Sequence, residues 1–131
     1  METHLPKQIL LPQKKIDIPV LILCYDRPDL LTILLKILKK YNVNNIYISQ
    51  DGYGGDNHLV IKRHNKVKKI IKRFGNKKKF KTNFFRKNLG KQIAPPKGID
   101  WFFKNVDKGI ILEDDTIPSK TFFNFCERLL R

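Results

Sequence analysis

The sequence of 131 residues has little cysteine and no long apolar run. Its two cysteines, Cys24 and Cys126, fall in different predicted elements, which argues against a disulfide framework. The longest apolar runs, such as Val20–Cys24, are far shorter than the roughly 20 residues that span a bilayer. The first residues lack the charged and then apolar order of a secretory signal. We therefore expect a cytoplasmic protein without a transmembrane segment.

Acidic residues are missing from a long part of the chain. Lys and Arg number 27 and Asp and Glu number 12, so the formal net charge is +15. Residues 57–99 contain 15 of the cations and no acid, and the rest of the chain, with 12 of each sign, is neutral. Two interpretations stay open. The stretch is either a solvated basic helix face or an anion site for nucleic acid, an acidic membrane or phosphates.

Apolar and aromatic residues are frequent enough to build a core. They make up 41% of the chain and include 9 Phe and 4 Tyr, which excludes a fully disordered protein. The length suits a single domain. We expect a polar leader over residues 1–17 and one domain over residues 18–131.

Short apolar runs alternate with helical patterns along this domain. Strands are predicted at about residues 19–24, 45–49, 80–85 and 109–113. Helices are predicted from Pro28 to about residue 40, from about residue 56 to 74 with Gly75-Asn76 as its end, after Pro95-Pro96, and after a cap at Ser119. Core aromatic residues are expected at Trp101, Phe102, Phe122 and Phe125. The alternation predicts an α/β fold with a mainly parallel sheet flanked by helices.

Charged groups follow each predicted strand. In open α/β sheets, ligands bind at the carboxyl ends of the strands. The four segments at these ends are Tyr25-Asp26-Arg27, Gln50-Asp51-Gly52, Arg86-Lys87-Asn88 and Glu113-Asp114-Asp115.

The acidic triplet Glu113-Asp114-Asp115 is the strongest of these signals. Consecutive carboxylates repel one another, so a position directly after a buried strand is costly unless a cation or hydrogen-bond donors compensate. Mg²⁺ or Mn²⁺ suits such a site, held by one or two carboxylates together with phosphate oxygens and water. The alternative is a solvated acidic turn before a helix.

Several familiar motifs are absent. The turn Gly52-Tyr53-Gly54-Gly55 does not match the dinucleotide-binding pattern GxGxxG, and no phosphate-binding P-loop is present. His4, His58 and His64 have no metal-ligand spacing with the cysteines, and we expect them at the surface.

The ordered motifs together resemble a known family. Val20 to Pro28, Ile48 to Gly52, Asn88-Leu89-Gly90, Trp101-Phe102-Phe103 and Gly109 to Asp115 are similar to GT-A glycosyltransferases, especially enzymes related to N-acetylglucosaminyltransferase I and their bacterial relatives. The resemblance covers about residues 18–131 and implies a Rossmann-like GT-A nucleotide-diphospho-sugar transferase fold. Pro95-Pro96 departs from the family pattern, because relatives keep a continuous helix there.

The resemblance also implies roles for individual residues. Arg27 and Asp51 would contact the nucleotide, Glu113 and Asp114 would face the nucleotide sugar, and Asp115 would bind the metal, Mn²⁺ or Mg²⁺. Family members continue into an acceptor half that supplies the catalytic base. The chain would thus be the donor half, truncated after the acidic motif, with its base expected beyond residue 131.

The expected function is transfer of a sugar from a nucleotide-diphosphate sugar to a glycan or other hydroxyl acceptor. Two alternatives stay open. One is a basic nucleic-acid-binding module formed by residues 57–99, and the other is an inactive glycosyltransferase fragment. For the basic stretch itself, we expect weak, salt-dependent and sequence-indifferent binding to polyanions.

Overall fold

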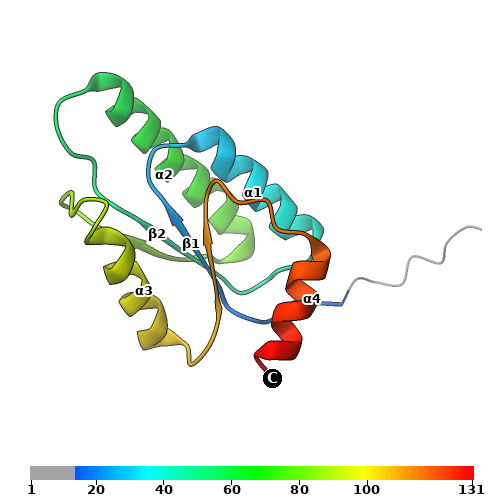
Figure 1. The fold of residues 1–131 in the computed structure, drawn as a ribbon. Helices are drawn as coiled ribbons and strands as arrows, with labels where there is room; N and C mark the ends of the chain where they lie inside the picture. The colour runs from blue at the N-terminus through cyan, green and yellow to red at the C-terminus, as the bar shows by residue number, and fades with distance from the viewer. Residues whose placement is uncertain (1–13) are drawn as a thin grey trace, which may run out of the picture.

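In the computed structural model, which describes residues 14–131, four strands alternate with four helices (Figure 1). The strands are β1 (Val20–Cys24), β2 (Ile46–Gln50), β3 (Lys81–Phe84) and β4 (Ile110–Glu113). They form one sheet in the order β3-β2-β1-β4, and all three strand pairs are parallel. The predicted α/β class and the four predicted strands are confirmed, and the sheet is wholly parallel.

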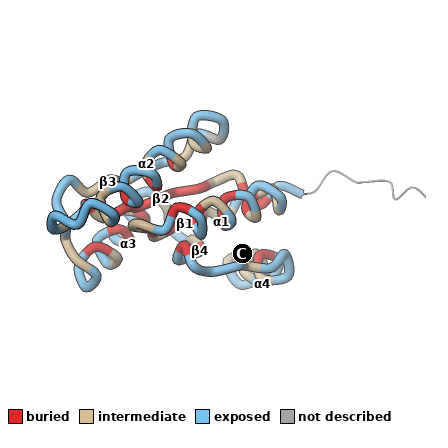
Figure 2. The backbone as a smooth tube through the Cα atoms, turned by 90° about the horizontal axis from the view of Figure 1, so that it is seen from above, coloured by how far each residue is buried: buried red, intermediate tan, exposed pale blue. Residues whose placement is uncertain are grey.

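Helices cover both faces of the sheet (Figure 2). The helices α1 (Pro28–Lys40), α2 (His58–Lys78) and α4 (Lys120–Leu129) contribute to the larger apolar cluster, which also contains Val20, Ile22 and Ile48. The helix α3 (Ala94–Asn105) packs on the opposite face, where Phe102 contacts Leu21 and Tyr47 in a second cluster. The division into two clusters follows from strand alternation, because neighbouring residues of a strand point to opposite faces of the sheet.

The helix ends follow local chemistry in most places. Pro28 and Pro95 lie in the first turns of α1 and α3, where the missing proline N–H is not needed. The Ser119 side chain accepts a hydrogen bond from the Phe122 N–H and so caps α4 as predicted. The helix α2 runs through Gly75, the predicted end, and stops at Lys79, whose φ of 53° is left-handed.

The aromatic core differs from the prediction at α4. Phe102 is buried as predicted, and Trp101 and Phe122 are partly buried. Phe125, however, is 57% exposed, while Phe123 is fully buried. Phe122, Cys126 and, just beyond the helix, Leu130 lie on the packed side of α4. Phe125 comes two residues after Phe123, so at about 100° per residue the two side chains are about 160° apart around the helix. The expectation that Phe125 belongs to the core is therefore wrong.

Part of the expected polar leader packs against the domain. Residues 1–13 lie outside the described residues, but Ile16 is buried and forms an isolated parallel bridge with Val43. The Ile16 N–H donates to the Asn42 carbonyl over 3.0 Å, and the Ile16 carbonyl accepts from the Asn44 N–H. The ordered domain thus begins before residue 18.

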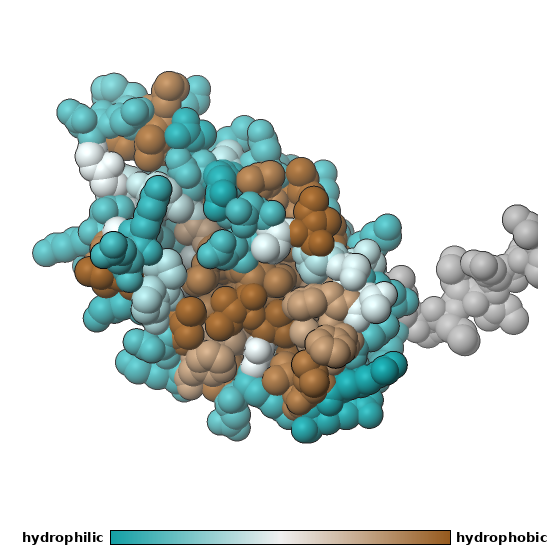
Figure 3. Space-filling model, viewed as in Figure 1, coloured by the Kyte–Doolittle hydropathy of each residue, from teal (hydrophilic) through white to brown (hydrophobic). Residues whose placement is uncertain are grey.

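The sheet face beside α3 is only partly covered. The helix α3 packs against β1 and β2, and β4 lies beyond it at the edge of the sheet. Figure 3 shows an apolar surface in this region, and both Ile111 of β4 and Phe103 of α3 are about two fifths exposed. No helix among the described residues is long and apolar enough to cross a membrane.

Candidate functional site

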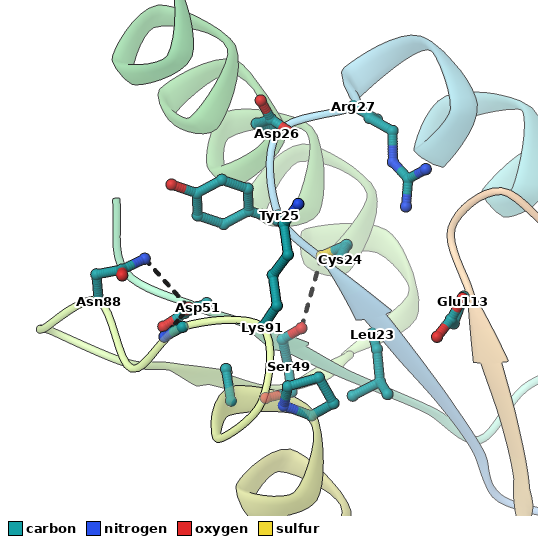
Figure 4. Close-up of a pocket in the computed structure, with 13 residues that line it drawn as sticks. Leu23, Cys24, Tyr25, Asp26, Arg27, Ser49, Asp51, Asn88, Lys91 and Glu113 are labelled. Carbon is teal, nitrogen blue, oxygen red and sulfur yellow. Dashed lines mark hydrogen bonds between the residues drawn. The ribbon is translucent and has the colours of Figure 1, made fainter. Parts of the chain in front are cut away.

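The carboxyl ends of the strands border one open cleft of about 640 Å³ (Figure 4). Because the strands are parallel, the segments that follow them meet at the same edge of the sheet. The lining residues with charged or amide side chains are Asp26, Arg27, Asp51, Asn88, Lys91 and Glu113. Of the site residues expected from the sequence, Arg27, Asp51 and Glu113 are thus brought together.

Arg27 connects the end of β1 to the acidic triplet after β4. Its guanidinium donates to Asp114 Oδ1 over 2.5 Å and lies 3.5 Å from Asp115 Oδ2. The Arg27 side chain is half exposed and faces the cleft, whereas the Asp114 side chain is almost completely buried. The buried carboxylate therefore orients the guanidinium at the cleft wall.

Burial dominates the electrostatics of Asp114. It raises the pKa of this carboxyl above its usual value, and the neighbouring Arg27 guanidinium offsets part of the rise. Asp114 Oδ2 is buried and has no hydrogen-bond partner among the described residues. Burial, together with the nearby Asp114, also raises the pKa of Cys24, so this thiol stays protonated.

The three acidic side chains point in different directions. Strand alternation continues past β4, so that Glu113 is exposed at the cleft, Asp114 turns inward and Asp115 is again exposed. Glu113 lines the cleft, whereas Asp114 and Asp115 contact Arg27 and are not among the lining residues. The described residues include no group of three or more His, Cys, Asp or Glu side chains that could hold a metal ion.

Asp51 holds the turn that follows β3. Its carboxylate accepts hydrogen bonds from the Leu89 N–H over 2.8 Å, the Gly90 N–H over 3.0 Å and the Asn88 amide over 3.2 Å. Asn88 also donates to the Gly52 carbonyl over 2.7 Å. A carboxylate offers about four lone-pair positions, so these donors take most of them. Asp51 therefore shapes the cleft wall and has limited capacity left for a ligand.

Gly52 permits the close approach of these two turns. A Cβ atom at this position would lie 2.7 Å from the Lys87 carbonyl carbon and 2.9 Å from the Phe85 oxygen. Such contacts are too short for any residue with a side chain. The glycine that follows Asp51 is thus required by packing between the turns.

Gln50 and His64 connect the segments that follow β1 and β2 to the helix α2. The Gln50 amide donates to the Tyr25 carbonyl over 2.9 Å and to the His64 carbonyl over 3.1 Å. His64 Nε2 lies 2.7 Å from the Asp51 carbonyl, and the His64 side chain is buried between the rings of Tyr25 and Tyr53. The expectation that His64 lies at the surface is wrong, because its ring joins the β2 end to the helix.

Lys91 also lines the cleft, although no motif of the sequence predicts it as a site residue. It follows the Asn88-Leu89-Gly90 turn, and Figure 4 shows its side chain extending along the cleft toward Tyr25. Asp26 of the cleft is paired with Arg63 over 3.0 Å, and Arg27 is paired with the acidic triplet. Among the described residues Lys91 has no ion pair or hydrogen-bond partner, so its charge is available to a ligand. Its position directly after Gly90 was the available signal.

The donors present fit a divalent cation only in combination with a ligand. Asp115 offers one exposed carboxylate, and Asp114 is turned inward toward Arg27. Mg²⁺ is commonly held by one or two carboxylates together with substrate phosphate oxygens and water. A cation at Asp115 would thus take most of its ligands from a bound diphosphate and from water.

Comparison with models of known families, with curated proteins and with solved structures found no match for this chain. The function is therefore inferred from the geometry of the cleft and from the motifs of the sequence.

Proposed function

We propose that the cleft binds a nucleotide-diphosphate sugar, and that the chain is the donor-binding part of a metal-dependent glycosyltransferase of the GT-A type. The observation that carries this proposal is the meeting of Arg27, Asp51 and Glu113 at one cleft, from three different strand ends. These residues belong to the ordered motifs that resemble the family. The cleft volume of about 640 Å³ lies within the range of small-molecule sites.

The diphosphate is assigned to the cationic side of the cleft. Lys91 supplies an unpaired ammonium group, and the half-exposed Arg27 guanidinium retains donors beyond those used by Asp114 and Asp115. Charge-assisted hydrogen bonds from such groups to phosphate oxygens are the strong ones in proteins. Two cations on separate elements suit a ligand with two linked phosphates.

The sugar and the nucleoside are assigned to the remaining lining residues. Glu113 has no ion-pair partner among the described residues and can accept hydrogen bonds from sugar hydroxyl groups. The Asp51 carboxylate keeps its turn in place and offers its remaining acceptor capacity to the nucleotide. Asp114, buried beneath Arg27, orients the guanidinium and does not touch the sugar.

Asp115 is the residue assigned to Mn²⁺ or Mg²⁺. When bound, such a cation neutralises the charge of the departing nucleotide diphosphate. Arg27 and Lys91 act in the same sense, because both line the cleft and bring positive charge to the diphosphate that leaves. A hydroxyl group of the acceptor attacks the anomeric carbon, and no described residue is assigned as the base that takes its proton.

Calorimetric titration with UDP, GDP and CDP, each with and without Mn²⁺, tests the metal and the nucleotide together. We expect one nucleotide to bind the wild type only in the presence of Mn²⁺. Asp115→Asn should abolish the metal-dependent binding with little change in fold, since Asp115 lies in a surface turn. Asp107→Asn, at another exposed aspartate, is the matched control and should bind like the wild type.

The outcomes separate the alternatives. Failure of all three nucleotides to bind the folded wild type would overturn the proposal and favour an inactive fragment. Binding that ignores both Mn²⁺ and Asp115→Asn would show that the acidic triplet is only a turn before a helix.

Lys91→Gln tests the assignment of the phosphates. The loss of one charge-assisted contact should weaken nucleotide binding by roughly tenfold or more, which corresponds to about 1.4 kcal/mol. Lys87→Gln is the control, because Lys87 is exposed in the same loop but does not line the cleft. If Lys91→Gln and Lys87→Gln changed the nucleotide affinity equally, the phosphates would not bind at Lys91.

A further inference from the structure

A second charged surface lies on α2, away from the cleft lining. Five cations follow one another at intervals of four, three, four and four residues along this helix, which places them on one face. All five are exposed, and the row is about 22 Å long at 1.5 Å per residue. We call it the basic stripe, formed by Lys62, Lys66, Lys69, Arg73 and Lys77.

The positive charges of the basic stripe are not neutralised by other described residues. None of its five side chains forms an ion pair or hydrogen bond with another described residue. Neighbouring cations do have partners: Arg63 pairs with Asp26, Lys68 lies 4.9 Å from the Phe84 ring centroid, and Lys81 donates to the Tyr47 hydroxyl. Like charges at this spacing destabilise a helix. An anionic partner would relieve this repulsion along the whole row.

The surroundings of the stripe argue against recognition of a single-stranded nucleic acid. Such recognition combines basic groups with exposed aromatic rings on which bases stack. The aromatic residues of the basic stretch are instead partly buried, and three of them pack against the larger core cluster. These three are Phe74, Phe80 and Phe84.

Two features favour a flat anionic surface. The helix α2 lies on the outside of the domain with its outer side exposed (Figure 2). Because the five cations share one face of the helix, they can meet a plane together. Leu59, in the first turn of the same helix, is 67% exposed. Helices that rest in the headgroup region of a bilayer combine basic residues with apolar side chains that enter it, and Leu59 offers one such side chain.

We propose that the basic stripe of α2 is a docking surface for a membrane rich in anionic phospholipids. Clusters of four to eight Lys or Arg on one helix face bind such membranes through the summed attraction to lipid headgroups. The attraction acts over about one Debye length and is weakened by salt. The proposal does not depend on the cleft or on its ligand.

Co-sedimentation with vesicles tests this surface. The wild type should sediment with vesicles of phosphatidylcholine containing about 30% phosphatidylserine and stay in solution with phosphatidylcholine alone. Replacement of all five stripe residues by Gln should lower the vesicle affinity by at least about tenfold. Far-UV circular dichroism and thermal unfolding check that the variant keeps its fold.

A variant that loses the same number of charges elsewhere distinguishes the effect of the stripe on vesicle binding from the effect of net charge. Five exposed lysines outside α2 are replaced by Gln, namely Lys36, Lys39, Lys104, Lys108 and Lys120. This control should retain the vesicle affinity of the wild type within about twofold, because the removed charges lie outside the stripe. Equal losses in the two variants would overturn the proposal, since total charge would then explain the binding.

A duplex nucleic acid is the competing polyanion. The same titration with a duplex DNA and a duplex RNA of unrelated sequences, at the same salt concentration, compares the two classes. We expect weaker and sequence-indifferent binding to the duplexes. Tighter binding to a duplex than to the anionic vesicles, or no binding to these vesicles at all, would overturn the membrane assignment.

Discussion

Asp51 holds the 88–90 turn through three hydrogen bonds, and that turn leads directly into Lys91. Replacement of Asp51 by Ala would leave the Leu89 and Gly90 N–H groups without their acceptor. An unsatisfied, partly buried donor costs about 1–3 kcal/mol. We expect Asp51→Ala to lower the free energy of unfolding by an amount in this range, measured by urea denaturation.

Asp56→Ala is the control for Asp51. Asp56 is exposed in the same inter-element segment and accepts no hydrogen bond from a described residue. Its replacement should change the free energy of unfolding by less than about 0.5 kcal/mol. Equal effects of the two substitutions would contradict a structural role for the Asp51 carboxylate.

Several residue roles could be read from the sequence, and others could not. The positions of Arg27, Asp51 and Glu113 at one sheet edge follow from parallel strands alone. The different directions of Glu113, Asp114 and Asp115 follow from strand alternation, which the sequence analysis did not apply past the strand end. The burial of His64 was not predictable locally, because it depends on contacts with Tyr25 and Asp51.

At the scale of elements, the distance between α3 and the sheet depends on Gly98. A Cβ atom here would lie 2.7 Å from Ser49 Oγ and 3.1 Å from Leu23 Cδ2. Alanine favours helices over glycine by about 1 kcal/mol, but α3 would have to move away from β1 and β2. We expect Gly98→Ala to lower the melting temperature in a thermal unfolding experiment.

Gly75→Ala in α2 should have the opposite effect on stability from Gly98→Ala. A Cβ atom at Gly75 would lie 3.4 Å from the Phe80 ring, which is ordinary contact. The substitution should therefore raise stability by up to about 1 kcal/mol, through helix propensity. A higher melting temperature for Gly98→Ala than for Gly75→Ala would contradict the close packing of α3.

The packed side of α4 is tested by two phenylalanines. Phe123 is fully buried against Tyr41 and Phe122, whereas Phe125 is more than half exposed. Phe123→Ala should lower the free energy of unfolding by about 3–5 kcal/mol, the usual range for a buried aromatic residue. Phe125→Ala should cost less than about 1 kcal/mol, as at most surface positions. A larger cost for Phe125→Ala in urea denaturation would contradict this orientation.

Element type was predictable here, and element ends were less so. The strands β1, β2 and β4 are largely apolar runs, whereas β3 is a mostly polar strand at the edge of the sheet. Pro28 and Ser119 mark helix starts through local chemistry. The sequence predicts the end of α2 too early, at Gly75, because glycine is a common helix stop. In the structure the helix continues, and Phe80 packs against Gly75 as the chain returns toward β3.

At the scale of the whole molecule, the charge distribution should affect stability. The net charge of +15 comes entirely from residues 57–99, and self-repulsion of this kind disfavours the compact state. We expect the free energy of unfolding to rise when NaCl is increased from about 20 mM to about 200 mM, since the screening length falls severalfold. Urea denaturation at the two salt concentrations measures the rise.

The variant with all five stripe residues replaced by Gln serves as the comparison. It should gain less from added salt than the wild type, because part of the repulsion has been removed. An equal gain in the two proteins would place the repulsion outside α2.

The pairing of β4 with β1 has a consequence for the order of folding. β1, β2 and β3 follow one another in both the chain and the sheet, so they can associate as they leave the ribosome. The Arg27–Asp114 bridge instead joins residues 87 positions apart, and it cannot form before β4 has been synthesised. Contacts of such long sequence separation form slowly, because the loop must close first. A nascent chain therefore displays Arg27 without its buried carboxylate, and ligand-binding competence should be the last property that the domain acquires.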